Sequence, residues 1–146
     1  MTQVDFHFNV PDKLPYACRL LRKALARGVP VLVTGSAEVL KQLDVLLWRF
    51  SAQDFLPHAM VSDHASVRAA SPILLTENMT DPPHLRALLN LGDSVPVGFD
   101  RFERLIEIVS QDDMQDRQLA RDRWRHYASL GCVPTRHDIA TRESTE

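Results

Sequence analysis

The fold class follows from residues 29–48, which read VPVLVTGSAEVLKQLDVLLW. Residues 29–33 form a short apolar run rich in β-branched residues, and this composition favours a buried strand. Ser36 follows the turn and is a suitable helix cap. Apolar side chains then recur three and four positions apart, at Val39, Leu40, Leu43, Leu46 and Leu47. The stretch therefore predicts a buried strand that leads through a short turn into a helix.

The same order of elements precedes this stretch. VDFHF at 4–8 alternates apolar and polar residues, which is the period of a half-buried strand. Residues 14–27 have the apolar spacing of a helix and end at Gly28. The order strand, helix, strand, helix is typical of a right-handed βαβ unit. We therefore predict an α/β fold, a single domain with a mostly parallel sheet flanked by helices.

The middle of the chain is less regular. Residues 59–61 and Ile73–Thr76 are short strand candidates, and residues 62–71 are expected to be a polar loop. RALLN at 86–90 is compatible with either a helix or a strand. RLIEIVS at 104–110 is also ambiguous, although its β-branched residues favour a strand.

Residues 111–130 have the clearest helical pattern. Acidic residues, including Asp112 and Asp113, lie at its start and arginines lie along its body, as the helix macrodipole favours. Gly131 ends the helix. We predict that residues 1–131 form the folded domain and that residues 132–146 are a polar, flexible C-terminal tail.

The composition restricts the class of protein. With 146 residues, 45% apolar and 25% charged, the chain has the make-up of one globular domain. Its formal net charge of -2 argues against a general nucleic-acid-binding protein, because such proteins carry a basic excess. Cys18 and Cys132 form no C-x-x-C pair and indicate two thiols in a reducing compartment. The chain has neither a signal peptide nor an apolar membrane span, so we expect a cytoplasmic protein.

No catalytic or metal-binding motif is present. The histidines lack ligand spacing such as H-E-x-x-H, and neither a phosphate-binding G-x-x-x-x-G-K-[ST] loop nor a G-x-S-x-G nucleophile elbow occurs. We therefore expect no cofactor, no metal and no enzymatic activity. The alternative is a small nucleotide-binding protein or enzyme that uses the turn VTGSAE at 33–38, because α/β proteins often bind phosphates between a strand and a helix.

The last predicted helix carries a binding pattern at 117–131, RQLARDRWRHYASLG. Arg117, Arg121 and Arg125 are spaced by four residues and share one stripe, and Trp124 lies three residues after Arg121. Two interpretations remain open. The stripe is either a solvated basic face over the helix core or part of a groove for a peptide with an acidic run and an apolar anchor.

Three segments together resemble a known family. They are LDVLLWRFSAQDFLPH at 43–58, GFDRFERLIEIVS at 98–110 and RQLARDRWRHYASLG at 117–131. They are similar to the χ (chi) subunit of bacterial DNA polymerase III holoenzyme, and the similarity extends from the VDFHF strand to about Gly131. The resemblance implies a single α/β domain similar to a nucleotide-binding fold, with strands at 86–90 and 104–110 and no catalytic activity of its own.

The resemblance also implies two protein partners. One is the ψ (psi) subunit, which connects χ to the clamp loader. The other is the C-terminal tail of single-stranded DNA-binding protein (SSB), a run of aspartates that ends in an apolar residue with a free carboxylate. Such a protein bridges the clamp loader to SSB during DNA replication, and it contacts nucleic acid only indirectly.

The ψ contact is implied at the end of the second helix. Trp48 and Phe55 correspond to the aromatic residues with which the family contacts ψ. Trp48 lies one position beyond the apolar stripe of its helix, and Pro57 stiffens the loop that follows Phe55. We expect both rings to be interface anchors rather than core residues.

The tail contact is implied on the last helix and the strand before it. Arg121 corresponds to the family's tail-binding arginine, and Trp124 corresponds to an aromatic residue of the pocket. Ser110 stands where the family has an apolar pocket residue, with Val109 as a substitute. The full expected set is Val109, Ser110, Arg117, Arg121, Trp124 and Arg125.

Overall fold

The computed structural model describes residues 2–50, 58–60, 72–77, 79 and 86–140. Its elements in chain order are β1 (Gln3–Val10), α1 (Lys13–Ala26), β2 (Val31–Thr34), α2 (Ala37–Phe50), β3 (His58–Met60), β4 (Ile73–Thr76), β5 (Ala87–Asn90), a 3-10 helix (Phe99–Arg101), β6 (Arg104–Ser110), α4 (Met114–Ser129) and β7 (Thr135–Asp138). The strand and helix predicted from residues 29–48 are therefore confirmed as β2 and α2.

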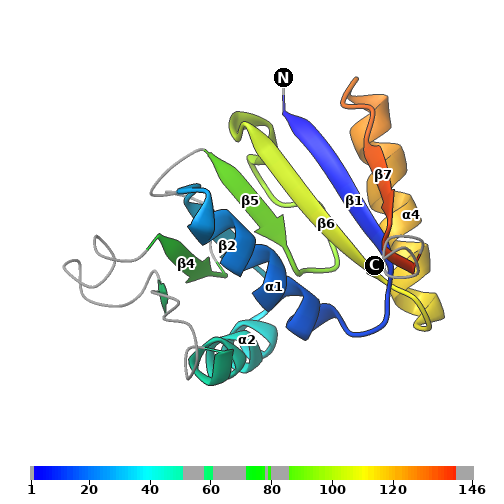
Figure 1. Ribbon diagram of the computed structural model, residues 1–146. Coiled ribbons are helices and arrows are strands. Elements are labelled where there is room, and N and C mark those ends of the chain that lie inside the picture. Colours follow the sequence, from blue (N-terminus) through cyan, green and yellow to red (C-terminus); the bar gives the residue numbers. More distant parts are fainter. Residues whose placement is uncertain (1, 51–57, 61–71, 78, 80–85, 141–146) are drawn as a thin grey trace.

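Within the described residues, the strands form one seven-stranded sheet in the order β3-β4-β2-β5-β6-β1-β7. Every neighbouring pair is parallel. In Figure 1, α1 and α2 cover one face of the sheet and α4 covers the other. The predicted α/β fold with a parallel sheet and flanking helices is confirmed.

The central strands are buried along their whole length because both faces of the sheet are covered. All four residues of β2 are buried, as are all four of β4 and of β5. The two ambiguous segments are strands β5 and β6, which pair with each other from Ala87 opposite Arg104 to Asn90 opposite Glu107. This pairing, which local sequence does not encode, decided their conformation.

Side-chain caps mark the starts of α2 and α4. The predicted start of α2 after Ser36 is confirmed, whereas α4 begins at Met114, three residues after the predicted start at 111. The Ser36 hydroxyl accepts a hydrogen bond from the backbone N–H of Val39 at 3.2 Å. The Asp113 carboxylate accepts from the backbone N–H groups of Gln115 and Asp116, at 3.0 and 3.1 Å. Each cap satisfies N–H groups that have no partner within their own helix.

The C-terminal region differs from the predicted tail. Residues 132–146 were expected to lie outside the folded domain, yet Thr135–Asp138 form β7 at the edge of the sheet. Gly131, at φ 85°, lets the chain leave α4 and run back beside β1. The sequence TRHD carries no apolar alternation and so gave no local sign of a strand. β7 is instead held by backbone pairing with β1 and by the contact of His137 Nε2 with Asp5 Oδ1 at 3.0 Å.

Two apolar cores lie on opposite faces of the sheet. The core beneath α1 and α2 includes Leu40, Leu43 and Leu47, each 0% exposed, as the apolar stripe of that helix predicts. The core beneath α4 includes Phe6 of β1 and Tyr127 of α4, with Phe8 and Trp124 partly buried at its margin. Among the described helices, none is long and apolar enough to cross a membrane.

Candidate peptide-binding groove

A groove of about 410 Å³ lies between α4 and the strands at one edge of the sheet. Its lining residues are Phe6, Phe8 and Asn9 of β1, Val109 and Ser110 of β6, Arg117, Ala120, Arg121, Trp124 and Arg125 of α4, and Arg136 of β7. All six residues expected to bind the tail line this groove. The structure thus brings the α4 stripe and the end of β6 into one concave surface.

The arginines dominate the electrostatics of the groove. The charged residues among its lining are Arg117, Arg121, Arg125 and Arg136, and none is acidic, although the chain as a whole carries a formal net charge of -2. An Asp or Glu side chain entering the groove would therefore meet only positive charge from the lining residues.

The three α4 arginines that line the groove differ in their existing contacts. Arg117 Nη1 donates to the backbone oxygen of Gln111 at 3.0 Å, and Arg125 Nη1 lies 3.5 Å from Asp122 Oδ1 in an exposed pair. Arg121 is exposed and makes no hydrogen bond or ion pair in the part of the chain that the structure describes. Its guanidinium is therefore the one on α4 with both edges available for a bidentate contact with a carboxylate.

Aromatic and aliphatic side chains form the apolar part of the groove. Phe6 is 3% exposed and packs against the half-buried Trp124, with ring centroids 5.0 Å apart. Val109 is 7% exposed on β6. These side chains offer an apolar surface beside the arginines, which suits a ligand with both a charged and an apolar part.

Ser110 lies at the end of this surface, and its polar atoms are engaged with the start of α4. Its hydroxyl accepts from the backbone N–H of Asp113 at 3.2 Å, and its own N–H donates to Asp116 Oδ2 at 2.8 Å. The Ser110 hydroxyl is thus engaged at the start of α4, and Val109 is the apolar β6 residue beside it in the lining of the groove.

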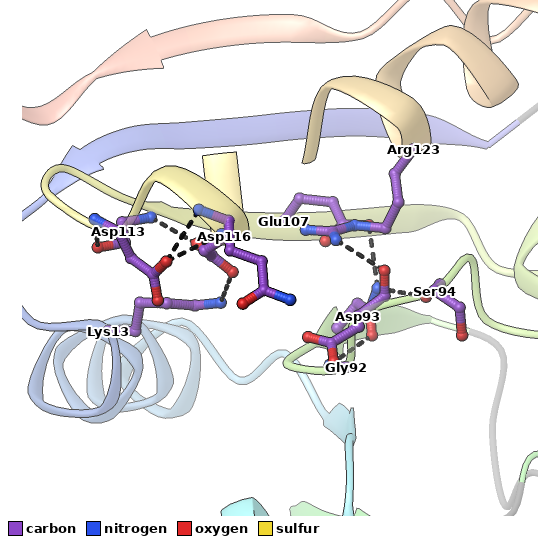
Figure 2. A network of polar contacts seen from close by, with 11 residues as sticks. Lys13, Gly92, Asp93, Ser94, Glu107, Asp113, Asp116 and Arg123 are labelled. Atoms are coloured by element: carbon purple, nitrogen blue, oxygen red, sulfur yellow. Dashed lines mark hydrogen bonds and ion pairs between the residues drawn. The ribbon is translucent and has the colours of Figure 1, made fainter. Parts of the chain in front are cut away.

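The start of α4 is tied to the rest of the fold, as Figure 2 shows. Lys13 Nζ of the first turn of α1 lies 3.0 Å from Asp116 Oδ1, and Asp113 caps the helix beside it. The acidic residues predicted to form a favourable helix N-terminus therefore also join α4 to α1 and β6. These contacts fix the position of the N-terminal end of α4, from which Arg117 projects.

A buried polar network fixes the rotation of α4 further along the helix. Arg123 is 3% exposed, and its Nε lies 3.1 Å from Oε2 of Glu107, which is 0% exposed. Tyr127 Oη and Asn90 Nδ2 donate to the same oxygen at 2.5 and 3.0 Å. Arg123 Nη1 also donates to the backbone oxygen of Asp93 at 3.0 Å, and Figure 2 shows Arg123 reaching from α4 toward Glu107 and Asp93.

This network has consequences for charge and orientation. Burial raises the pKa of Glu107, and the nearby Arg123 guanidinium and the hydrogen bonds from Tyr127, Asn90 and Arg123 oppose that rise. Residues two apart on a helix lie on nearly opposite sides. With Arg123 directed into the protein, Arg121 and Arg125 are directed outward to the groove.

The sequence did not identify several residues of the site. Arg136 was placed in the expected tail, and its guanidinium carbon lies 5.0 Å from the centroid of the Phe8 ring. Phe6 and Phe8 alternate along VDFHF, so that pattern already indicated that they share a face. Arg123 was predicted only as one of the arginines along the helix body, and no local signal distinguishes it from its neighbours.

The second predicted surface lies at the end of α2. Trp48 is 59% exposed and Val45, one turn earlier, is 45% exposed. The Trp48 ring lies 4.9 Å from the ring of His58, centroid to centroid, and His58 Nε2 lies 3.0 Å from Asp44 Oδ1. Phe55 and Pro57, also predicted for this surface, lie outside the described residues. Since α2 and α4 cover opposite faces of the sheet, this surface and the groove are well separated (Figure 1).

The turn at 33–38 borders a different pocket, of about 640 Å³, at the carboxyl ends of β2 and β5. Its described lining includes Ser36, Asn90 and Gly92, and its charged members are Glu77 and Asp93. A phosphate would find no lysine or arginine among these lining residues. The described residues also contain no cluster of His, Cys, Asp or Glu able to hold a metal ion.

The fold and the groove define an α/β protein with a cationic, partly aromatic surface suited to an acidic peptide. The chain matches the protein-family model described as "DNA polymerase III chi subunit, HolC" over residues 1–135. It is 33% identical to the DNA polymerase III subunit chi of Pseudomonas aeruginosa over 139 residues, which cover 90% of this chain and 92% of that relative. The chain therefore belongs to the DNA polymerase III chi subunit family and is an accessory component of this DNA replication complex.

Proposed function

We propose that this protein is a non-catalytic bridge between the ψ subunit of the clamp loader and the acidic C-terminal tail of SSB. The observation that carries the proposal is the groove, in which all six residues assigned to tail binding converge. Trp48 is exposed on the opposite face, which supports a separate contact with ψ. The family of the chain supports a role in the replication complex.

The groove matches the chemistry of an acidic tail with an apolar terminus. The Arg121 guanidinium is free to hold the terminal carboxylate through two parallel hydrogen bonds. The terminal apolar side chain would pack on the surface made by Trp124 and Val109. Arg117 and Arg125 lie along the same stripe and would face the aspartates upstream.

The two surfaces together explain how a small adaptor can act without catalysis. A protein that holds ψ on one face and the SSB tail on the other keeps the clamp loader close to SSB on the lagging strand. The second contact then forms at a high effective concentration, so two contacts of modest affinity produce a stable link.

The SSB-tail contact is tested by titrating the protein with a labelled peptide that has an aspartate run and a terminal phenylalanine. We expect binding to weaken by roughly tenfold or more when the peptide ends in an amide, because the charged acceptor for Arg121 is lost. Binding should also weaken as salt rises, since exposed charges are screened within about 8–10 Å. Equal affinity for the acid and the amide would contradict the assignment of the terminal carboxylate to this groove.

The ψ contact is tested by Trp48→Ala. The substitution should leave the fold intact, because the side chain is 59% exposed, and should weaken ψ binding by about 2 kcal/mol or more if Trp48 is a hot spot. Calorimetric titration with purified ψ measures the loss, and Val97→Ala is the control because Val97 is 81% exposed elsewhere on the surface. Wild-type affinity of Trp48→Ala for ψ would exclude this contact.

A further inference from the structure

We propose that Arg136 and Phe8 form a second recognition wall of the groove, which selects acidic residues upstream of the peptide terminus from the side opposite α4. The inference rests on the proposed function, because it concerns the ligand of the same groove. It adds a specificity determinant from β7 that neither the sequence pattern nor the family resemblance identified. The family match ends at residue 135, immediately before Arg136.

The position of Arg136 follows from the register of the last strand. β7 pairs with β1 so that Arg136 lies opposite Phe6 and Asp138 lies opposite Phe8. Alternation along a strand directs every second side chain to the same face, so Arg136 shares the face on which Phe6 and Phe8 lie beneath α4. It therefore reaches the groove from the sheet edge, whereas the other three arginines reach it from the helix.

The Arg136 side chain is held ready for a ligand. Its guanidinium carbon lies 5.0 Å from the centroid of the Phe8 ring, within the range of a cation–π contact. Arg136 makes no hydrogen bond or ion pair in the part of the chain that the structure describes, so its N–H groups remain available for acceptors. Because the exposed side chain already rests against Phe8, less conformational entropy is lost when a carboxylate binds.

The two residues that follow Arg136 hold its strand in place. His137 Nε2 contacts Asp5 Oδ1 of β1 at 3.0 Å. Asp138 Oδ1 accepts hydrogen bonds from Asn9 Nδ2 and from the backbone N–H of Ala140, each at 3.1 Å. Asp138, the acidic residue of β7, therefore accepts hydrogen bonds from Asn9 and Ala140, and it is not among the residues that line the groove.

The two walls suit an extended acidic peptide better than a single charged stripe does. A strand-like peptide directs successive side chains to opposite sides. In the groove, one set of carboxylates would face the α4 arginines and the alternate set would face Arg136. The terminal apolar side chain would occupy the surface near Trp124, between the walls.

The test compares Arg136→Ala with Arg19→Ala in titrations of the labelled acidic peptide. Arg19 is the matched control, because it is exposed on α1 and its guanidinium carbon lies 5.7 Å from the ring centroid of Tyr16, far from the groove lining. We expect Arg136→Ala to bind about threefold to tenfold more weakly at low salt and Arg19→Ala to bind as wild type does. Wild-type affinity of Arg136→Ala would overturn the inference while leaving the proposed function intact, whereas no binding by the wild-type protein would refute the proposed function itself.

A second peptide, with the upstream aspartates replaced by asparagines and the terminus unchanged, distinguishes charge recognition from a structural effect of Arg136. If Arg136 contacts the acidic run, Arg136→Ala and the wild-type protein should bind this peptide with nearly equal affinity. An equal loss with both peptides would mean that Arg136 only maintains β7, and would overturn the inference. Arg136→Gln, which keeps a polar planar group without charge, should behave as Arg136→Ala does with both peptides.

Discussion

Replacing Arg123 by methionine should lower the free energy of unfolding by about 3–5 kcal/mol, the usual cost of removing one member of a buried ion pair. Methionine fills much of the space of the arginine stem, so the main loss is charge compensation rather than volume. Glu107 would remain 0% exposed and would lose the Nε–H donor that lies 3.1 Å from its Oε2. Chemical denaturation of the purified protein measures the loss.

The cost of Arg123→Met should be larger at pH 8 than at pH 5. Burial raises the pKa of Glu107 above its ordinary value of 4.5, and Arg123 opposes that rise, so removing Arg123 raises the pKa further. When the pKa of a carboxyl is higher in the folded protein than in the unfolded chain, its stabilising contribution is complete at a pH below the unfolded-state pKa. That contribution is lost as the pH rises through the folded-state pKa. Denaturation curves of both proteins across this pH range measure the difference.

Two further variants separate this mechanism from a general defect in α4. Arg125→Met removes an exposed arginine two residues away and should change stability by no more than about 0.5 kcal/mol. Adding Glu107→Gln to Arg123→Met removes the uncompensated carboxylate and should recover part of the loss. A cost for Arg123→Met that is independent of pH, with no recovery in the double variant, would contradict the charge argument.

Arg121→Ala should reduce affinity for the acidic tail peptide by roughly 1.5–3 kcal/mol, or about 10- to 150-fold, the range for a hydrogen bond to a charged group. The side chain is exposed and has no partner in the described part of the chain, so its removal should not affect folding. The loss should come from the terminal carboxylate, which no other α4 arginine is as free to hold in a bidentate contact. Fluorescence anisotropy with the labelled peptide measures it.

The variants Arg121→Lys and Arg27→Ala complete this experiment. Lysine keeps the positive charge but lacks the planar fork of donors, so Arg121→Lys should recover only part of the affinity. Arg27 is exposed at the end of α1, outside the groove, and Arg27→Ala should bind the peptide as wild type does. Full affinity in Arg121→Ala would exclude Arg121 as the carboxylate-binding group.

Local sequence determined the elements whose signals are periodic and complete within one segment. The apolar stripe of α2, its Ser36 cap and the acidic start of α4 each place interacting groups three or four residues apart, which is within reach of a single helical turn. The spacing of Arg117, Arg121 and Arg125 belongs to the same class of signal. The sequence alone therefore predicts that these three arginines share one face of the helix.

Tertiary structure decided whatever depends on partners distant in the chain. Residues 87–90 form a strand because they pair with β2 and β6, and residues 135–138 form β7 because they pair with the edge of β1. Of the similar arginines along α4, Arg123 is buried because Glu107 lies opposite it, sixteen residues earlier in the sequence. Arg136 joins the groove only because β7 lies beside β1. The sequence by itself thus determined the helices and the α4 stripe. Long-range pairing of strands and charges decided the sheet order, the buried network and the second wall of the groove, because no local pattern encodes such pairing.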